Sequence, residues 1–194
     1  MSQPALDRRA AMAALLRERD DNLLVVPGLG STTYDLAALG DDPRNFYLRG
    51  AMGGAAMIGL GLALAQPQRR VAVITGDGEM LMGLSSLATI GVQKPQNLAV
   101  VVFDNGAYGE TGMQPSHTSR GVDLVAVARG CGFDTCLDLR DEQGLAGLAA
   151  RLGSFAGPLF ARVAINADEP PRVLPEKDGI VLKRRFRAAL GLEP

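Results

Sequence analysis

Two polar turns in this chain carry residue types that can hold a divalent cation. Gly76-Asp77-Gly78 follows an apolar run at 71–75, and Asp104-Asn105 follows another at 98–103. Carboxylate and carboxamide oxygens are hard ligands that suit Mg²⁺, which fills its remaining positions with water and phosphate. The glycines let backbone N–H groups approach a phosphate, and a helix starting after Gly78 would direct its positive end at the same point. The pattern predicts a Mg²⁺-diphosphate site.

The elements around these turns must bring them to one edge of a sheet. Residues 71–75 and 98–103 are short, rich in β-branched side chains and typical of strands buried on both faces of a parallel sheet. One helix is predicted between them, with this apolar face: Met80, Leu84, Leu87, Ala88 and Gly91. Because both strands of a right-handed βαβ unit point the same way, the two turns should meet at the carboxyl edge, where open α/β sheets bind ligands.

The remaining periodicity predicts an α/β fold. The expected strands are 22–26, 71–75, 98–103, 133–139 and 159–165, with a brief extended piece at 46–48. The expected helices are 5–19, 34–39, one after Gly54 through Ala65, one that begins directly after Gly78, 123–129, 141–152 and one from Ile180 onward. We expect a single doubly wound domain over residues 1–194, with about six mostly parallel strands and helices on both faces. Residues 168–178, rich in proline and charge, are expected to connect this core to the C-terminal helix.

The two terminal helices are predicted to be amphipathic. In the first, the arginines should lie outside, around this apolar face: Leu6, Ala10, Ala13 and Leu16. In the last, Leu182, Phe186 and Leu190 lie one turn apart, with a basic outer face that is either solvated or docked on a partner.

Composition excludes several classes of protein. With 194 residues, 47% hydrophobic content, a net charge of −1 and a pI near 5.8, nothing favours nucleic acid or an anionic membrane as a partner. The apolar run 53–65 is too short and glycine-rich to span a membrane, and no signal-peptide pattern occurs, so a cytoplasmic protein is expected. Cys131 and Cys136 match neither a redox pair nor a zinc site, and buried, inert thiols are expected.

A dinucleotide site is a weaker alternative. Gly28, Gly30 and Thr33 follow a predicted strand in a GxGxxT pattern. However, no later strand presents an acidic residue for a ribose, because Asp41 and Asp42 lie in a loop.

The two polar turns together resemble the diphosphate-binding motif of thiamine-diphosphate-dependent enzymes, in which GDG is followed at this distance by two asparagines. Asp104 stands in place of the first asparagine, and Asn105 preserves the second. The resemblance implies thiamine diphosphate as cofactor, with Mg²⁺ held by Asp77, Asn105 and the main-chain carbonyl of Ala107. It implies cofactor contacts at Ser31, Gly50, Met52, Gly76, Asp77, Gly78, Glu79, Asn105, Ala107, Tyr108 and Gly109.

The segment from Gly50 to Gly61 holds five glycines, each of which weakens a helix by up to about 1 kcal/mol relative to alanine. Tight packing of a helix on the sheet is one explanation. The family resemblance adds another: the carbonyl of Gly50 would accept a hydrogen bond from the 4′-amino group of the cofactor. Met52 would then support the bent form of the cofactor.

The polar loop 110–120 should meet the substrate at the same sheet edge. It contains the only histidine, His117, which we expect to face the pocket as a candidate catalytic residue, although a lone surface histidine often has no role. We expect residues 112–119 to be mobile without substrate. Some family members carry a catalytic carboxylate just beyond the metal loop, and Thr111 occupies that position.

The whole chain looks most like the β subunits of two-subunit 2-oxo acid decarboxylases, a group that includes sulfopyruvate and phosphonopyruvate decarboxylases. This family needs a glutamate from a pyrimidine-binding domain, which this sequence lacks. The resemblance therefore implies a pyrimidine-binding α subunit, a heterotetramer or larger even-numbered complex, and a small 2-oxo acid substrate. Arg49 and Arg120 are the cations near the motifs that could bind an anionic substrate. Alternatives are a carboligase, an oxidative 2-oxo acid enzyme and a Mg²⁺-nucleotide-binding or regulatory subunit.

Overall fold

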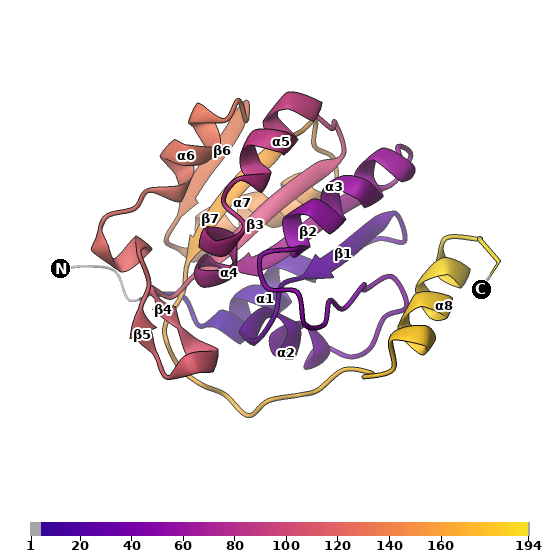
Figure 1. Ribbon diagram of the computed structural model, residues 1–194, viewed down its shortest axis with the longest axis horizontal. Coiled ribbons are helices and arrows are strands. Elements are labelled where there is room, and N and C mark those ends of the chain that lie inside the picture. The colour runs from indigo at the N-terminus through magenta and orange to yellow at the C-terminus, as the bar shows by residue number, and fades with distance from the viewer. Residues whose placement is uncertain (1–4, 194) are drawn as a thin grey trace.

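Five of the predicted strands form one parallel sheet. In the computed structural model, which describes residues 5–193, the strand order is β1-β2-β3-β7-β6 and every neighbouring pair is parallel (Figure 1). The strands are β1 (Leu23–Pro27), β2 (Arg70–Gly76), β3 (Leu98–Asp104), β6 (Thr135–Leu139) and β7 (Leu159–Ala164). The central strands β2 and β3 are buried along almost their whole length, as their continuous apolar runs require.

Helices cover both faces of the sheet, so the predicted doubly wound α/β fold is confirmed (Figure 1). One face is covered by α3 (Ala55–Ala65), α4 (Asp77–Met82), α5 (Ser86–Gln93) and α6 (Leu124–Gly130). The other face is covered by α1 (Arg8–Leu16), α2 (Ser31–Ala37) and α7 (Glu142–Leu152). Asp141 caps α7 as predicted, by accepting a 2.7 Å hydrogen bond from the N–H of Gly144.

The C-terminal helix α8 (Gly179–Ala189) packs on its own chain. Leu182 and Phe186 are buried as predicted, and the rings of Phe186 and Phe46 meet edge-on with centroids 5.2 Å apart. Residues 166–178 contain no helix or strand and run along the outside of the domain before α8 (Figure 1). No helix within residues 5–193 is long and apolar enough to cross a membrane.

The brief extended piece predicted at 46–48 does not join the sheet as a strand. Only a single bridge joins Asn45 to Val25 of β1, supported by a 2.8 Å hydrogen bond from the N–H of Phe46 to the carbonyl of Val25. Ladder pairing stops there, and the chain turns at Gly50, where φ is +71°. The main sheet therefore has five strands instead of about six.

The single helix predicted after Gly78 is two helices, α4 and α5, separated around Gly83. The backbone of Gly83 lies against that of Gly53, and a Cβ at Gly83 would overlap the Gly53 carbonyl. This close approach interrupts the helix. Ala88, predicted to face the core, is exposed, because the break rotates the buried face of α5 onto Leu87 and Ile90.

The predicted apolar face of the first helix is only half right, since Leu6 and Leu16 pack against the core. Ala10 and Ala13 are exposed, whereas Arg8 is buried together with Met12 and Leu15. The guanidinium of Arg8 lies 2.7 Å from the carboxylate of Asp35 on α2, so the arginine enters the interior as half of an ion pair. The spacing of apolar residues cannot identify the buried face of this helix, because that face includes the charged residue Arg8.

Two glycines of α3 allow a matched test of helix-on-sheet packing. A Cβ at Gly59 would overlap Val73 of β2, whereas one at Gly61 would meet open space. We expect Gly59→Ala to lower the free energy of unfolding by about 1–3 kcal/mol through overpacking. Gly61→Ala should raise it by about 0.4–1 kcal/mol through lower entropy of the unfolded chain. Urea denaturation of both variants measures this, and equal effects at the two positions would contradict the packing explanation.

Candidate functional site

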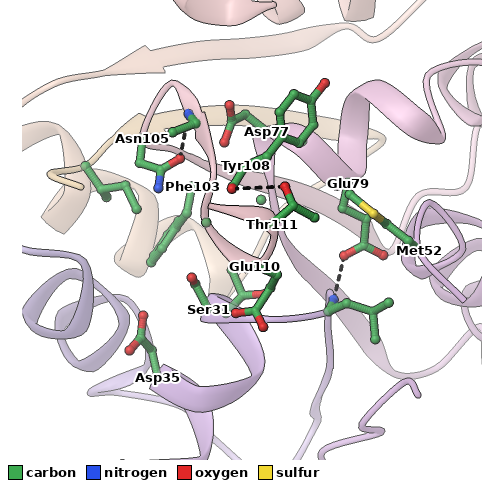
Figure 2. Close-up of a pocket in the computed structure, with 17 residues that line it drawn as sticks. Ser31, Asp35, Met52, Asp77, Glu79, Phe103, Asn105, Tyr108, Glu110 and Thr111 are labelled. Atoms are coloured by element: carbon green, nitrogen blue, oxygen red, sulfur yellow. Dashed lines mark hydrogen bonds between the residues drawn. The ribbon is translucent and has the colours of Figure 1, made fainter. Parts of the chain in front are cut away.

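A cavity of about 180 Å³ lies at the carboxyl edge of the sheet (Figure 2). Its walls come from the segments that follow β1, β2, β3 and β7, which is where an open parallel sheet binds ligands. Lining residues are Leu29, Ser31, Thr32, Asp35, Met52, Gly76, Asp77, Gly78, Glu79, Phe103, Asn105, Ala107, Tyr108, Gly109, Glu110, Thr111 and Ile165. The Asp77 and Asn105 turns therefore meet in one cavity, as the βαβ argument predicted.

Asp77 begins α4 and has only 2% of its surface exposed. Its carboxylate accepts hydrogen bonds from the hydroxyls of Ser116 and of Thr118, the latter at 3.1 Å. Burial, with a smaller contribution from the charge of Asp104, raises the pKa of Asp77 to about 6, although the hydroxyl donors oppose the shift. A buried carboxylate whose charged form is this unfavourable is one that a bound cation would stabilise.

Asn105 and Ala107 form the second side of the candidate metal site. The side-chain carbonyl of Asn105 accepts a 3.0 Å hydrogen bond from the N–H of Ala107, which closes a tight turn. Gly106 has a φ of +71°, which allows the turn, and its carbonyl accepts a 2.8 Å bond from the N–H of Ser116. A short hairpin follows, with β4 (Ala107–Tyr108) antiparallel to β5 (Gln114–Pro115).

These donors fit Mg²⁺ and a diphosphate. Within residues 5–193 no three His, Cys, Asp or Glu side chains cluster as a metal site, so a cation here would use one carboxylate, one amide and a main-chain carbonyl. Such an oxygen set leaves positions for phosphate and water. The first N–H groups of α4 lack intrahelical partners and can bind phosphate. A Cβ at Gly78 would lie 2.6 Å from the Tyr108 ring, so glycine is required there.

Glu79 lies at the base of the cavity and explains the glycine pattern after β1. Its carboxylate accepts a 2.6 Å hydrogen bond from the N–H of Leu29, and a Cβ at Gly28 would overlap the same oxygen. Burial raises the pKa of Glu79. Gly28 thus makes room for a carboxylate of this chain, in the place that a dinucleotide would need for its pyrophosphate. This contact disfavours the dinucleotide alternative.

Met52 and Ser31 line the cavity, and Gly50 does not. The Met52 side chain is 43% exposed and is one of the lining side chains labelled in Figure 2. The hydroxyl of Ser31 accepts a 2.9 Å hydrogen bond from the Arg8 guanidinium, which itself pairs with Asp35. Gly50 lines a neighbouring cavity, on the other side of the turn that begins at Leu29.

The two candidate catalytic residues differ in position. Thr111 lines the cavity, and its hydroxyl donates to the side chain of Gln114 at 2.8 Å. His117 does not line the cavity, contrary to expectation. It is exposed, and its Nδ1 lies 3.0 Å from the hydroxyl of Tyr108, whose side chain separates it from the interior. A catalytic role for His117 stays a prediction, and in this structure it would act through Tyr108.

Sequence reasoning missed the network around Asp104. This buried carboxylate accepts a 2.8 Å hydrogen bond from the hydroxyl of Thr118 and pairs with Arg162 of β7 at 2.5 Å. Arg162 also pairs with Asp138 of β6 at 2.7 Å. The one available signal was the aspartate at a position where the family motif has asparagine, since a second buried carboxylate beside Asp77 requires a cation.

Comparison with known proteins agrees with this geometry. Residues 28–162 match the family model "Thiamine pyrophosphate enzyme, C-terminal TPP binding domain". The chain is 42% identical over 171 residues to the sulfopyruvate decarboxylase subunit beta of Methanothermobacter thermautotrophicus, covering 85% of this chain and 86% of that one. It is 40% identical over 195 residues to the phosphonopyruvate decarboxylase of Streptomyces viridochromogenes, covering 96% of this chain but only 47% of that longer protein.

Solved structures show the same fold. A thiamin diphosphate-dependent enzyme from Mycobacterium smegmatis superposes with a TM-score of 0.71 and 25% identity, over 84% of this chain and 32% of that one. The benzoylformate decarboxylase of Polynucleobacter necessarius superposes with a TM-score of 0.74 and 22% identity, over 86% of this chain and 34% of that one. The buried Asp77, the Asn105 turn and the family match lead to one conclusion: this chain belongs to the thiamine pyrophosphate enzymes and carries their C-terminal cofactor-binding domain.

Proposed function

We propose that residues 1–194 act as the diphosphate-binding β subunit of a two-subunit, thiamine-diphosphate-dependent decarboxylase of a small 2-oxo acid. Residues 168–178 connect the core to α8. The observation that carries the proposal is the cavity in which Asp77, Asn105, Ala107 and Met52 come together. Support also comes from the similarity to a sulfopyruvate decarboxylase β subunit along most of both chains.

In this proposal the chain binds and orients the cofactor. Mg²⁺ would be held by the Asp77 carboxylate, the side chain of Asn105 and the carbonyl of Ala107. The diphosphate would be bound by four backbone amides, those of Gly78, Glu79, Tyr108 and Gly109. When bound there, thiamine diphosphate would supply the nucleophile and the electron sink that decarboxylation of a 2-oxo acid needs. Met52 presents a flexible, polarizable side chain at the open side, where it supports the reacting half of the cofactor.

A partner subunit completes the site. Met52 and Met57 are each 43% exposed and Met82 is 67% exposed. Met52 lines the cavity, and Met82 lies close to the neighbouring Gly53. Exposed apolar side chains gathered beside a site are typical of an interface. A pyrimidine-binding α subunit seated here would supply the catalytic glutamate, in a heterotetramer or larger even-numbered complex.

Two other functions share this cavity. A carboligase or an oxidative 2-oxo acid enzyme would bind the cofactor identically, and analysis of the product as aldehyde, acyloin or oxidised acid separates them from a decarboxylase. A regulatory or Mg²⁺-nucleotide-binding subunit would bind ATP or GTP in preference to thiamine diphosphate. Calorimetric titration with each ligand tests that alternative.

Asp77 tests the metal assignment. We expect Asp77→Ala to weaken Mg²⁺-dependent binding of thiamine diphosphate by about 100-fold or more, because residues that merely support a metal ligand already cost about 10- to 100-fold when removed. Isothermal titration calorimetry on the assembled complex measures this. Asp134→Ala, which removes an exposed carboxylate, is the matched control. Wild-type affinity in the Asp77 variant would refute the assignment.

Replacing Met52 should lower the turnover number without weakening the binding of the cofactor. We expect Met52→Ala to lower kcat by about 10- to 100-fold, the effect of small misplacement of reacting groups. The dissociation constant of Mg²⁺-thiamine diphosphate should change by less than about threefold. Leu64→Ala, another exposed side chain further along the same segment, should change neither. If kcat is unchanged, Met52 is only a surface or interface residue.

Assembly gives a test independent of any single side chain. Purified alone, the chain should bind cofactor weakly and decarboxylate nothing, because the proposed pyrimidine-binding surface and catalytic glutamate come from the partner subunit. Mixing with the pyrimidine-binding subunit should restore activity and produce an even-numbered complex, which analytical ultracentrifugation can detect. Full activity from this chain by itself would contradict the two-subunit proposal.

A further inference from the structure

A second cavity, of about 260 Å³, lies across the Leu29 turn from the first. Three segments far apart in the sequence form it: the turn after β1, the segment before α3 and the connector that precedes α8. Leu29 borders both cavities, and Gly50 lines the second. The second cavity therefore opens beside the end of the site where the reacting half of the cofactor is expected.

Basic side chains surround this cavity. Arg49 and Lys177 line it, and neither side chain makes an ion pair or a hydrogen bond with any residue in the described range 5–193. Arg172 is 56% exposed, and its guanidinium lies 5.3 Å from the centre of the Tyr34 ring, a lining residue. We call Arg49, Arg172 and Lys177 the basic rim.

Three carboxylates lie near the basic rim, and two of them are held by backbone donors. Glu110 lies 3.6 Å from Arg172 and accepts a 3.3 Å hydrogen bond from the Tyr34 hydroxyl. Glu176 accepts hydrogen bonds from the backbone N–H groups of Lys177 and Asp178, and Asp178 caps α8 through the N–H of Ile180 at 2.7 Å. Within residues 5–193, only Glu110 forms an ion pair with the basic rim, so the side chains of Arg49 and Lys177 keep their N–H donors free for an external anion.

Tyr34 lines the second cavity together with Arg49 and lies under the guanidinium of Arg172. Burial and the charge of Glu110 raise the pKa of its phenol, while the positive charges of Arg172 and Arg49 oppose that rise. Both guanidinium groups therefore lie close enough to influence the same hydroxyl. The Tyr34 ring fixes Arg172 at one side, and the remaining N–H donors of its guanidinium are free to bind an anion.

Resting on the proposed function, we propose that the basic rim binds the tetrahedral oxyanion, a sulfonate or a phosphonate, carried by the 2-oxo acid substrate. An arginine fork matches two oxygens of such a group, and Lys177 adds a point charge. Glu110 links the two cavities, because it lines the first and contacts Tyr34 and Arg172 at the second. A substrate with its 2-oxo end toward the first cavity would place its anionic head at the rim, and a subunit seated over Met52 would shield both from water.

The test compares substrates that differ only in the head group. In the complex with the pyrimidine-binding subunit, Arg49→Gln and Arg172→Gln should each raise KM for sulfopyruvate and phosphonopyruvate about 10-fold or more, the effect of losing a charge-assisted hydrogen bond. KM for pyruvate and the dissociation constant of thiamine diphosphate should change less than twofold. Arg129→Gln, at the exposed end of α6, is the control and should change none of these values. Arg172→Lys should recover only part of the loss, because lysine cannot bind bidentately.

Several results would overturn the proposal. KM values that rise equally for pyruvate, or that do not rise, would exclude recognition of the head group. If the variants instead prevent association of the two subunits in gel filtration, the rim is a protein interface and the proposal is wrong.

If the wild-type complex decarboxylates no 2-oxo acid, the proposed function is wrong. Binding of an anionic head group at the basic rim can then be tested separately, by calorimetric titration with sulfoacetate, phosphonoacetate and acetate. Binding of the first two above acetate, lost in Arg49→Gln and Arg172→Gln, would support it. Equal binding of all three probes, or none, would overturn it.

Discussion

The charge of Asp77 is the constraint on which this site depends. Its carboxylate is almost fully buried at the end of a central strand, and no cationic side chain of the described residues lies within ion-pair distance of it. Hydroxyls of Ser116 and Thr118 hold the carboxylate in place without neutralising it. Neutral donors orient a carboxylate but leave its desolvation largely uncompensated. The fold thus keeps a buried negative charge available for an external cation.

Asp104, at the same edge of the sheet, differs from Asp77 because an arginine of this chain neutralises its charge. Arg162 on β7 is paired in register with Val102 of β3 and with Asp138 of β6. Its side chain can therefore reach Asp104 and Asp138 from the strand between them. Thr118 contacts both Asp104 and Asp77, so the two buried carboxylates share one hydroxyl while only one of them has an arginine. The aspartate that replaces the asparagine of the family motif is thus compensated by a cation 58 positions later in the chain.

The sequence predicted those structural features that depend on residues close together in the chain. The sheet, its carboxyl edge and the meeting of Asp77 with Asn105 follow from continuous apolar runs and short turns, and these were confirmed. The buried ion pair between Arg8 and Asp35 joins residues 27 positions apart, so the spacing of residues along the chain could not predict it. The break near Gly83 depends on the backbone of Gly53, and His117 turns to Tyr108, contacts that only the folded chain brings about. Predictions failed where a distant residue, rather than a neighbour, determined the conformation.

The open side of the cavity follows from how a doubly wound sheet is built. The strand ends supply backbone donors, the Asp77 carboxylate and the Asn105 amide, but the helices cover the faces of the sheet and leave its carboxyl edge uncovered (Figure 1). Thus Asp77 is buried and Asn105 and Ala107 are half-buried, whereas Met52 and the residues of the basic rim are exposed. Electrostatic interactions at those outer groups stay weak while water surrounds them. A second protein surface over this edge would exclude that water, which is why we propose that the chain acts together with a partner subunit.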